Sequence, residues 1–213
     1  PKMLASFEDG SKTMIEMTAL ANAINLPPDQ IGMNGPVSSV EELNKVLIPQ
    51  ADGGVLSESG RVDYAFGPAP GVFSIVKSDN PTVIEEMEYL SMGEGPYYTL
   101  YRPYHLASIE APRSIGMAII NNEPGLQPKS WIAEVIGHTK KDLKKGEKID
   151  GIGGFATYGV TYPVANTDNL IPLGLLEGAT VIKDLKKGEP ITKDSVELPE
   201  NLINSLRKLQ EAS

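Results

Sequence analysis

Apolar and polar positions alternate along this chain with two different periods. Spacings of three and four residues, a Ser39/Glu42 capping box and a Pro at a first turn predict helices. Runs of β-branched and aromatic residues predict strands. The expected helices are 11–24, 39–49, 81–90, 107–120 and 199–209, and the expected strands are 2–7, 62–66, 72–76, 97–101 and 131–136. Strands that alternate with helices predict an α+β fold, an α/β layered domain, over the first part of the chain.

A repeated hexapeptide marks a second region. Asp-Leu-Lys-Lys-Gly-Glu occurs at 142–147 and again at 184–189, and an apolar residue follows soon after each copy. Identical hexapeptides at this distance predict a small, two-fold, β-rich module in the last third of the chain. The Gly/Pro-containing stretch 121–130 is the expected linker. We therefore predict domains at 1–128 and 131–198, followed by a C-terminal helix at 199–213, and we expect any chemistry to lie before about residue 130.

Charge and composition exclude several classes of partner and of chemical site. The chain of 213 residues has a net charge of −9, which disfavours nucleic acid and anionic membranes as general partners. Its longest apolar runs are only a few residues, so no membrane span is expected. The absence of cysteine excludes thiol nucleophiles and zinc–thiolate sites and agrees with a cytoplasmic location. Because the chain opens at Pro1 without an initiator Met, we expect it to be part of a longer polypeptide.

The first candidate site runs from Glu8 to Glu16. Two adjacent carboxylates, Glu8 and Asp9, precede a glycine turn, and Ser11 and Lys12 follow it at the predicted start of a helix. Backbone N–H groups at a helix start favour anions, and a lysine adds a point charge. Lys12 and Glu16 lie four residues apart on one helix face. The simpler alternative, which local physics favours, is a helix cap next to a surface ion pair.

The second candidate site is Tyr-Arg-Pro-Tyr-His-Leu at 101–106. His105 follows Arg102 and Tyr104 where a predicted strand meets a predicted helix, a frequent place for functional residues. His105 can act as an acid–base group or hydrogen-bond donor, and Arg102 can bind a phosphate or carboxylate in a bidentate manner. An aromatic core strand whose histidine is merely hydrogen-bonded is the alternative, and both remain open.

Other stretches suggest structure instead of chemistry. Asp-Gly-Ile-Gly-Gly at 150–154 has the wrong spacing for a dinucleotide fingerprint and predicts a tight turn. His138 is expected to be structural. Glu85, Glu86 and Glu88 predict a solvated helix face.

Taken together, the stretch 6–16, the hexapeptide at 101–106 and the repeat resemble one family. It comprises the homoserine-dehydrogenase-like NAD(P)-dependent oxidoreductases with a C-terminal SAF domain, including enzymes similar to 1-deoxy-D-xylulose 5-phosphate reductoisomerase. Region 131–198 resembles the SAF (antifreeze-like, β-clip) domain, an all-β fold that also ends sialic acid synthases and occurs in flagellar P-ring assembly proteins.

The resemblance implies that this chain is the substrate and SAF portion of an enzyme whose NADP or NAD is bound by an upstream Rossmann domain. It implies hydride transfer to or from a small carbonyl or hydroxy compound, free or phosphorylated. On this basis Lys12 is the proton donor, Asp9, Glu8 and Glu16 position it, and Glu8 and Asp9 are candidate ligands of a divalent metal. Ser11, Arg102, Tyr104 and His105 hold the substrate, with His105 also a candidate catalytic group.

We expect a cytoplasmic homo-oligomer with a small-molecule substrate, and a fragment that is inactive in hydride transfer on its own. The rival hypothesis is a non-enzymatic SAF-containing binding or assembly module for a sugar-like ligand or a partner chain.

Overall fold

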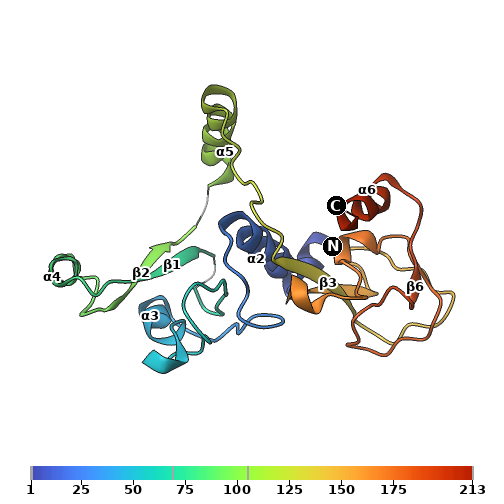
Figure 1. Ribbon diagram of the computed structural model, residues 1–213, viewed down its shortest axis with the longest axis horizontal. Coiled ribbons are helices and arrows are strands. Elements are labelled where there is room, and N and C mark those ends of the chain that lie inside the picture. The colour runs from blue at the N-terminus through green and yellow to red at the C-terminus, as the bar shows by residue number, and fades with distance from the viewer. Residues whose placement is uncertain (1, 69, 105, 213) are drawn as a thin grey trace. The chain divides into compact units, whose positions relative to one another are not determined.

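The computed structural model describes residues 2–68, 70–104 and 106–212, which form two compact units. One unit joins residues 1–33 to residues 128–213, and the other comprises residues 34–127. Helices and small antiparallel sheets are present in this chain (Figure 1), so its fold class is α+β as predicted. The two units are compact regions of the structure and do not test domain boundaries. The predicted division into domains 1–128, 131–198 and 199–213 stays a prediction.

The first unit begins with two helices. α1 (Lys2–Glu8) stands where a strand was predicted for residues 2–7, so that prediction is wrong. A short apolar run does not distinguish strand from helix, and its lysine, methionine, leucine and alanine are all good helix formers. α2 (Ser11–Ile24) is the predicted helix, and it ends at Asn25, which has a left-handed backbone with φ 59°.

The β-rich part of this unit is built around a two-stranded ribbon. β3 (Ala133–Thr139) pairs antiparallel with β4 (Thr157–Pro163), with Ile136 opposite Val160. The shorter strands β5 (Thr180–Val181) and β6 (Val196–Glu197) form a second antiparallel pair. Isolated β-bridges such as Lys148 to Thr180 join the remaining segments into a small all-β fold.

The two hexapeptides face each other across a local two-fold. Leu143 and Leu185 exchange both backbone hydrogen bonds, each at 2.9 Å. The lysines and aspartates reciprocate: Lys144 Nζ lies 2.8 Å from Asp184, and Lys186 Nζ lies 3.1 Å from Asp142. The identical sequences therefore make identical contacts, which is the two-fold module that the repeat predicts.

An apolar core fills much of this β-rich part. It contains both repeat leucines together with Val181 of β5 and Val196 of β6. Its buried members are Leu143, Ile149, Ala156, Ile171, Leu173, Leu176, Ala179, Val181, Leu185, Ile191 and Val196. Each of these side chains is removed from water, which is the main favourable contribution to folding.

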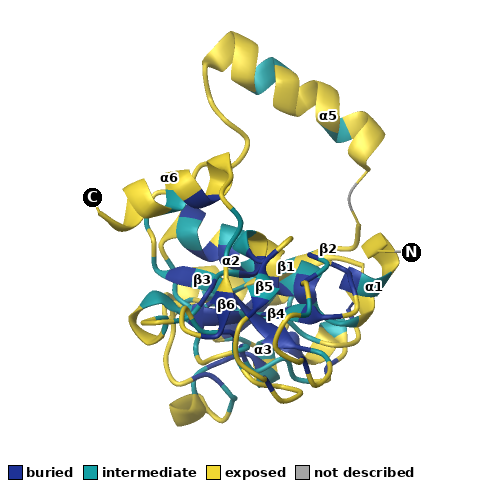
Figure 2. Ribbon diagram, turned by 90° about the vertical axis from the view of Figure 1, so that its right-hand side faces the viewer, coloured by how far each residue is buried: buried dark blue, intermediate teal, exposed yellow. Residues whose placement is uncertain are grey.

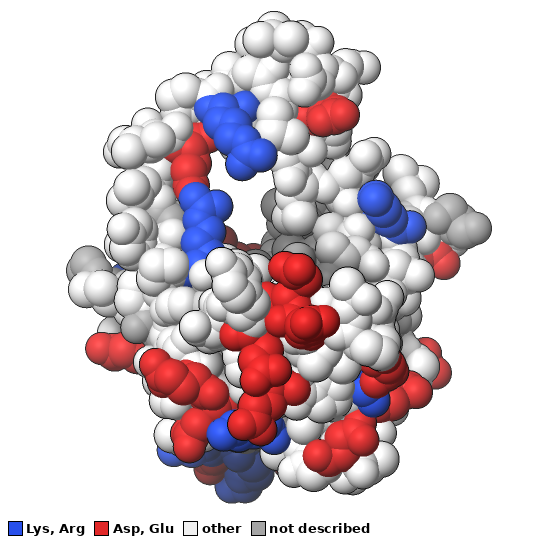
Figure 3. All heavy atoms as spheres, turned by 90° about the vertical axis from the view of Figure 1, so that its left-hand side faces the viewer, with Lys and Arg blue, Asp and Glu red and all other residues white. Residues whose placement is uncertain are grey.

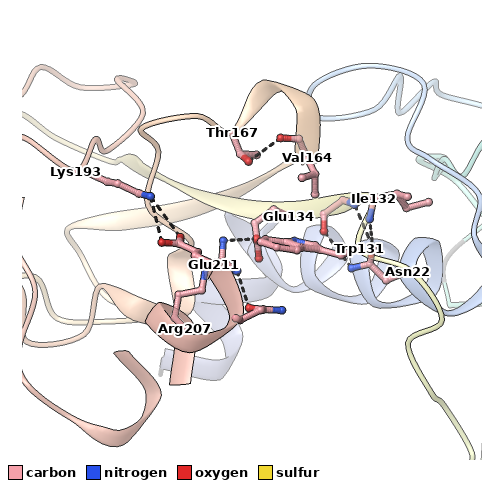
Figure 4. Close-up of polar contacts among 11 residues, drawn as sticks. Asn22, Trp131, Ile132, Glu134, Val164, Thr167, Lys193, Arg207 and Glu211 are labelled. Atoms are coloured by element: carbon pink, nitrogen blue, oxygen red, sulfur yellow. Dashed lines mark hydrogen bonds and ion pairs between the residues drawn. The ribbon is translucent and has the colours of Figure 1, made fainter. Parts of the chain in front are cut away.

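The C-terminal helix α6 (Leu202–Glu211) is attached by charged and aromatic contacts (Figure 4). Arg207 lies over the Trp131 ring at 4.7 Å and pairs with Glu134 at 2.7 Å and with Glu211 at 3.0 Å. Lys193 reaches Glu211 from the loop before β6. The apolar side chains of this helix are largely exposed, as Leu202 and Leu209 show.

The second unit holds a smaller core beneath the antiparallel strands β1 (Val72–Lys77) and β2 (Tyr97–Arg102). The predicted helix at 39–49 is present only as the short turns η1 (Val40–Glu42) and α3 (Leu43–Val46). After Val46 the chain instead bonds to the following loop, where Gly54 packs tightly against the Ile48 carbonyl. The predicted strand at 62–66 is absent: Val62 and Phe66 occupy only isolated bridge positions, and Phe66 is bridged to Val37 in parallel.

The other helices of this unit expose most of their surface. α4 (Pro81–Tyr89) begins after Asn80, whose side chain accepts a hydrogen bond from Thr82 N, and its glutamates are exposed as predicted. Figure 3 shows acidic side chains gathered on the face that carries α4. α5 (Ala107–Gly116) continues into a π-helical turn, η3 (Met117–Asn121), and neither contains a buried residue (Figure 2). Within the described parts of the chain, no helix combines the length and apolar character needed to cross a bilayer.

Candidate functional site

The first candidate site is the turn between α1 and α2. Gly10 lies at the N-terminus of α2 with φ 80°, a conformation that glycine adopts without a side-chain clash. The Asp9 carboxylate performs the capping that Gly10 cannot, because its Oδ1 accepts a hydrogen bond from Ser11 N at 2.8 Å. This turn directs residues 11 and 12 to opposite environments.

Lys12 projects from the first turn of α2 on the solvent side. Its side chain is 39 % exposed, its Nζ lies 3.7 Å from Glu16 Oε1, and it lies 4.0 Å from the centre of the Phe7 ring. The predicted contact between Lys12 and Glu16 is therefore present. This contact by itself has the geometry of an ordinary i, i+4 surface pair, so a catalytic role needs additional support.

Asp9 is held by an ion pair from the β-rich part of the same unit. Lys140 Nζ lies 2.5 Å from Asp9 Oδ2, and the Asp9 side chain is only 13 % exposed. Burial alone would raise the pKa of Asp9, but hydrogen bonds from Lys140 and Ser11, with the charge of Lys140, lower it below its ordinary value. Asp9 is therefore a fixed carboxylate and is poorly suited to donate a proton.

Ser11 is fully buried. Its hydroxyl accepts a hydrogen bond from Gly159 N in β4 at 2.8 Å. This contact ties the start of α2 to the ribbon, as does the Thr18 to Thr161 hydroxyl contact at 3.0 Å about two turns further along the same face. The predicted role of Ser11 in substrate binding stays untested, and the structure gives its hydroxyl a packing partner.

Metal binding gains no support from this turn. Glu8 is exposed, and both Asp9 oxygens already have partners in Ser11 and Lys140. Across residues 2–68, 70–104 and 106–212, no group of three or more carboxylate, histidine or cysteine side chains is placed to hold a metal ion.

The second candidate site belongs to the other compact unit. Arg102, at the end of β2, forms an ion pair with Glu110 of α5, and Tyr104 is exposed. His105 lies outside the described residues. The predicted roles of Arg102, Tyr104 and His105 remain predictions.

Gly151, Gly153 and Gly154 belong to a turn whose space is filled by other parts of the chain. The Asp150 carboxylate accepts hydrogen bonds from Phe155 N at 2.6 Å and Ala156 N at 3.1 Å, and Lys2 Nζ donates to the Asp150 carbonyl. A Cβ at Gly153 would lie 2.1 Å from the Lys2 carbonyl oxygen. These glycines permit close packing, and the loop does not fit a dinucleotide phosphate.

Lys140 is the residue of this site that the sequence did not reveal. Its ammonium bridges Asp9 and the Gly154 carbonyl, which it meets at 2.7 Å. In the sequence, Lys140 is one of several paired lysines near the first hexapeptide, and nothing local distinguishes it from Lys141. The partner lies 131 positions away, so only the fold brings the two together.

Comparison with protein-family models gives two matches. Residues 134–197 match the SAF domain, which agrees with the all-β fold of this region. No curated protein sequence matches the chain. Residues 1–111, more than half of the chain, match the model described as the catalytic domain of oxidoreductase DRL, and this region contains the whole Glu8–Glu16 turn. The chain therefore belongs to the DRL oxidoreductase family, joined to a SAF domain.

Proposed function

We propose that this chain is the substrate-binding and proton-transferring part of an NAD(P)-dependent oxidoreductase. Its substrate is a small carbonyl or hydroxy compound, free or phosphorylated, as in the homoserine-dehydrogenase-like and reductoisomerase-like enzymes that the sequence resembles. The observation that carries the proposal is the match of residues 1–111 to an oxidoreductase catalytic domain, which includes an accessible ammonium at a helix start.

Lys12 is the proposed proton donor. When bound, the nicotinamide cofactor supplies the hydride for the carbonyl carbon. As the carbonyl π bond breaks, negative charge develops on the substrate oxygen, and Lys12 transfers a proton from Nζ to that oxygen. The neutral amine then regains a proton from solvent, which its partly exposed position permits. Glu16 holds the ammonium on the helix face, and Phe7 limits its movement on the other side.

The dinucleotide is assigned to an upstream Rossmann domain, on the basis of the family resemblance. The glycine-containing turn at 150–154 does not fit a dinucleotide, because Lys2 and Asp150 fill it. We assign no metal ion to the site, since Lys140 occupies the carboxylate that would bind it.

The test is the variant Lys12→Gln in the full-length gene product. NADPH consumption is measured with 1-deoxy-D-xylulose 5-phosphate, and NADP⁺ reduction is measured with L-homoserine. Loss of a general acid lowers kcat by about 10²- to 10⁴-fold. The control Lys45→Gln alters an exposed lysine in the last turn of α3 and leaves kcat unchanged. Full activity of Lys12→Gln, with the fold intact, would disprove the assignment.

A second candidate function is ligand binding by the SAF part without catalysis. A groove of about 770 Å³ beside α6 is lined by charged and amide side chains such as Lys193, Asn201 and Lys208, together with apolar side chains such as Leu175 and Leu198. Polar side chains of this kind suit a sugar-like ligand. Absence of turnover in the wild type, together with saturable binding of a sugar that Lys12→Gln does not alter, favours this candidate.

A further inference from the structure

The start of α2 is held from outside the helix. No side chain caps α2 at its N-terminal residue Gly10, and the stabilising contacts come from Asp9 and from Gly159, which binds the Ser11 hydroxyl. Asp9 therefore holds the backbone of the residue directly before Lys12.

Lys140 is the residue that fixes Asp9. It lies directly after β3, in the region matched to the SAF domain, and its side chain is only 22 % exposed. Its ammonium makes two contacts, with Asp9 Oδ2 at 2.5 Å and with the Gly154 carbonyl at 2.7 Å. Its backbone N–H is bonded to the Ala156 carbonyl at 2.8 Å, so the residue is anchored at both ends.

The neighbouring lysine makes a useful contrast. Lys141 is 53 % exposed, and its ammonium pairs with Glu147 inside the hexapeptide turn. The charge and chemical type are the same, and the position differs by one residue. Any effect specific to Lys140 must therefore come from its contacts with Asp9 and Gly154.

We propose that Lys140 of the SAF domain is a positioning residue for Lys12, acting through the Asp9 carboxylate and the turn that begins α2. The SAF domain then forms part of the support of the reaction site. This inference rests on the proposed role of Lys12. In the absence of Lys140, Asp9 would be a largely buried carboxylate without its ammonium partner, and rotation of that carboxylate would release Ser11 N.

The first experiment does not depend on activity. In the full chain, the titration of the Asp9 carboxyl is followed by carbon NMR, and the exchange rate of the Ser11 amide is followed by hydrogen exchange, in Lys140→Met, Lys140→Arg and Lys141→Met. We expect Lys140→Met to raise the pKa of Asp9, since burial remains while the ammonium is gone, and to speed Ser11 exchange at least tenfold. In Lys140→Arg the pKa of Asp9 and the exchange rate of the Ser11 amide should stay close to the wild-type values, because the positive charge is kept. Lys141→Met should resemble the wild type. An unchanged Asp9 titration in Lys140→Met overturns the proposal.

The second experiment measures the reaction. With the assays described for Lys12, Lys140→Met lowers kcat at least tenfold with little change in KM, and Lys140→Arg recovers most of the loss. In an Asp9→Asn background, Lys140→Met causes no further loss, because both changes act through the same contact. Independent, multiplicative losses overturn the proposal. If the wild type transfers no hydride while Asp9 still responds to Lys140→Met, the proposed function fails and the structural link stands.

Discussion

His138 shows how one side chain can link the fold to pH. It is buried between Tyr158 and Tyr162, and its Nδ1 lies 2.9 Å from the Gly188 carbonyl oxygen. A carbonyl only accepts, so Nδ1 carries the proton and Nε2 accepts from the Tyr162 hydroxyl at 2.9 Å. Burial lowers the pKa of His138, and the bond to Gly188 opposes this only in part.

This environment predicts a loss of stability in mild acid. Between the lowered folded pKa and the ordinary unfolded value of 6.5, the unfolded chain binds more protons than the folded chain. The free energy of unfolding therefore falls as the pH drops from about 7 towards 5. Urea denaturation at several pH values measures this change in the free energy of unfolding.

The matched variants separate the two histidines of the chain. His138→Gln is less stable at neutral pH but loses the pH dependence in this range, whereas His105→Gln keeps it. A wild-type protein whose stability is constant between pH 7 and 5 would contradict the prediction.

At the residue scale, the sequence could predict contacts within one helix turn. The spacing of Lys12 and Glu16 is sufficient to place them together, and their contact is found. Asp9 and Lys140 are joined only by the folding of distant segments, so local physics could not pair them. The same holds for Ser11, whose buried partner Gly159 lies in β4.

At the scale of elements, the repeat leucines carry the clearest energetic consequence. Leu143 and Leu185 are 1 % and 6 % exposed and are bonded to each other across the local two-fold. Replacement of either by alanine leaves a cavity in the same core, and the cost expected for each is about 2–5 kcal/mol. Chemical denaturation of Leu143→Ala and Leu185→Ala measures both values, which should be similar.

The control and the coupling sharpen this prediction. Leu202→Ala removes a side chain of the same size that is 73 % exposed on α6, and its effect should stay within about 0.5 kcal/mol. The double variant should depart from the sum of the single variants, because the two residues are in contact. A strongly unequal pair of single effects would show that the two halves of the module are not energetically equivalent.

Periodicity predicted elements well where a long amphipathic or strongly marked segment existed. α2 and α4 follow the predicted ranges closely, and β2 was recognisable from its tyrosines. It failed at 2–7 and 62–66, because a run of five or six residues fits either period and only a partner strand decides. No partner is present for either segment among the described strands.

At the scale of the whole molecule, the packing of residues 1–33 with the β-rich region has no counterpart in the sequence pattern. Asn22 of α2 shows this packing most fully: its side chain accepts bonds from Ile132 N and Ala133 N at 2.9 and 3.0 Å, and donates to the Ala133 carbonyl at 3.0 Å (Figure 4). The backbone carbonyl of Asn22 also accepts hydrogen bonds from Lys129 N and Ser130 N. One asparagine thus fixes the entry of the chain into β3.

These contacts predict that residues 34–127 can be excised without unfolding the rest. Both ends of the excised segment are anchored on the same unit, since Gly32 N bonds to the Thr161 carbonyl at 2.7 Å and Lys129 N bonds to Asn22. A flexible Gly/Ser linker of about 20 residues in its place should leave one cooperative denaturation transition, because loop closure costs only about 0.6 kcal/mol per doubling of length.

The matched chain for comparison begins at residue 131 and lacks both helices α1 and α2. It loses the partners of Gly159 N, Thr161 and Ala133, and the face of β3 and β4 that α2 covers becomes exposed to water. We expect it to denature at lower urea than the excised chain, with faster amide exchange in β4. Equal stability of the two chains would mean that α1 and α2 contribute little to the stability of the ribbon formed by β3 and β4. The proposed link from Lys140 to Lys12 would then lack structural support.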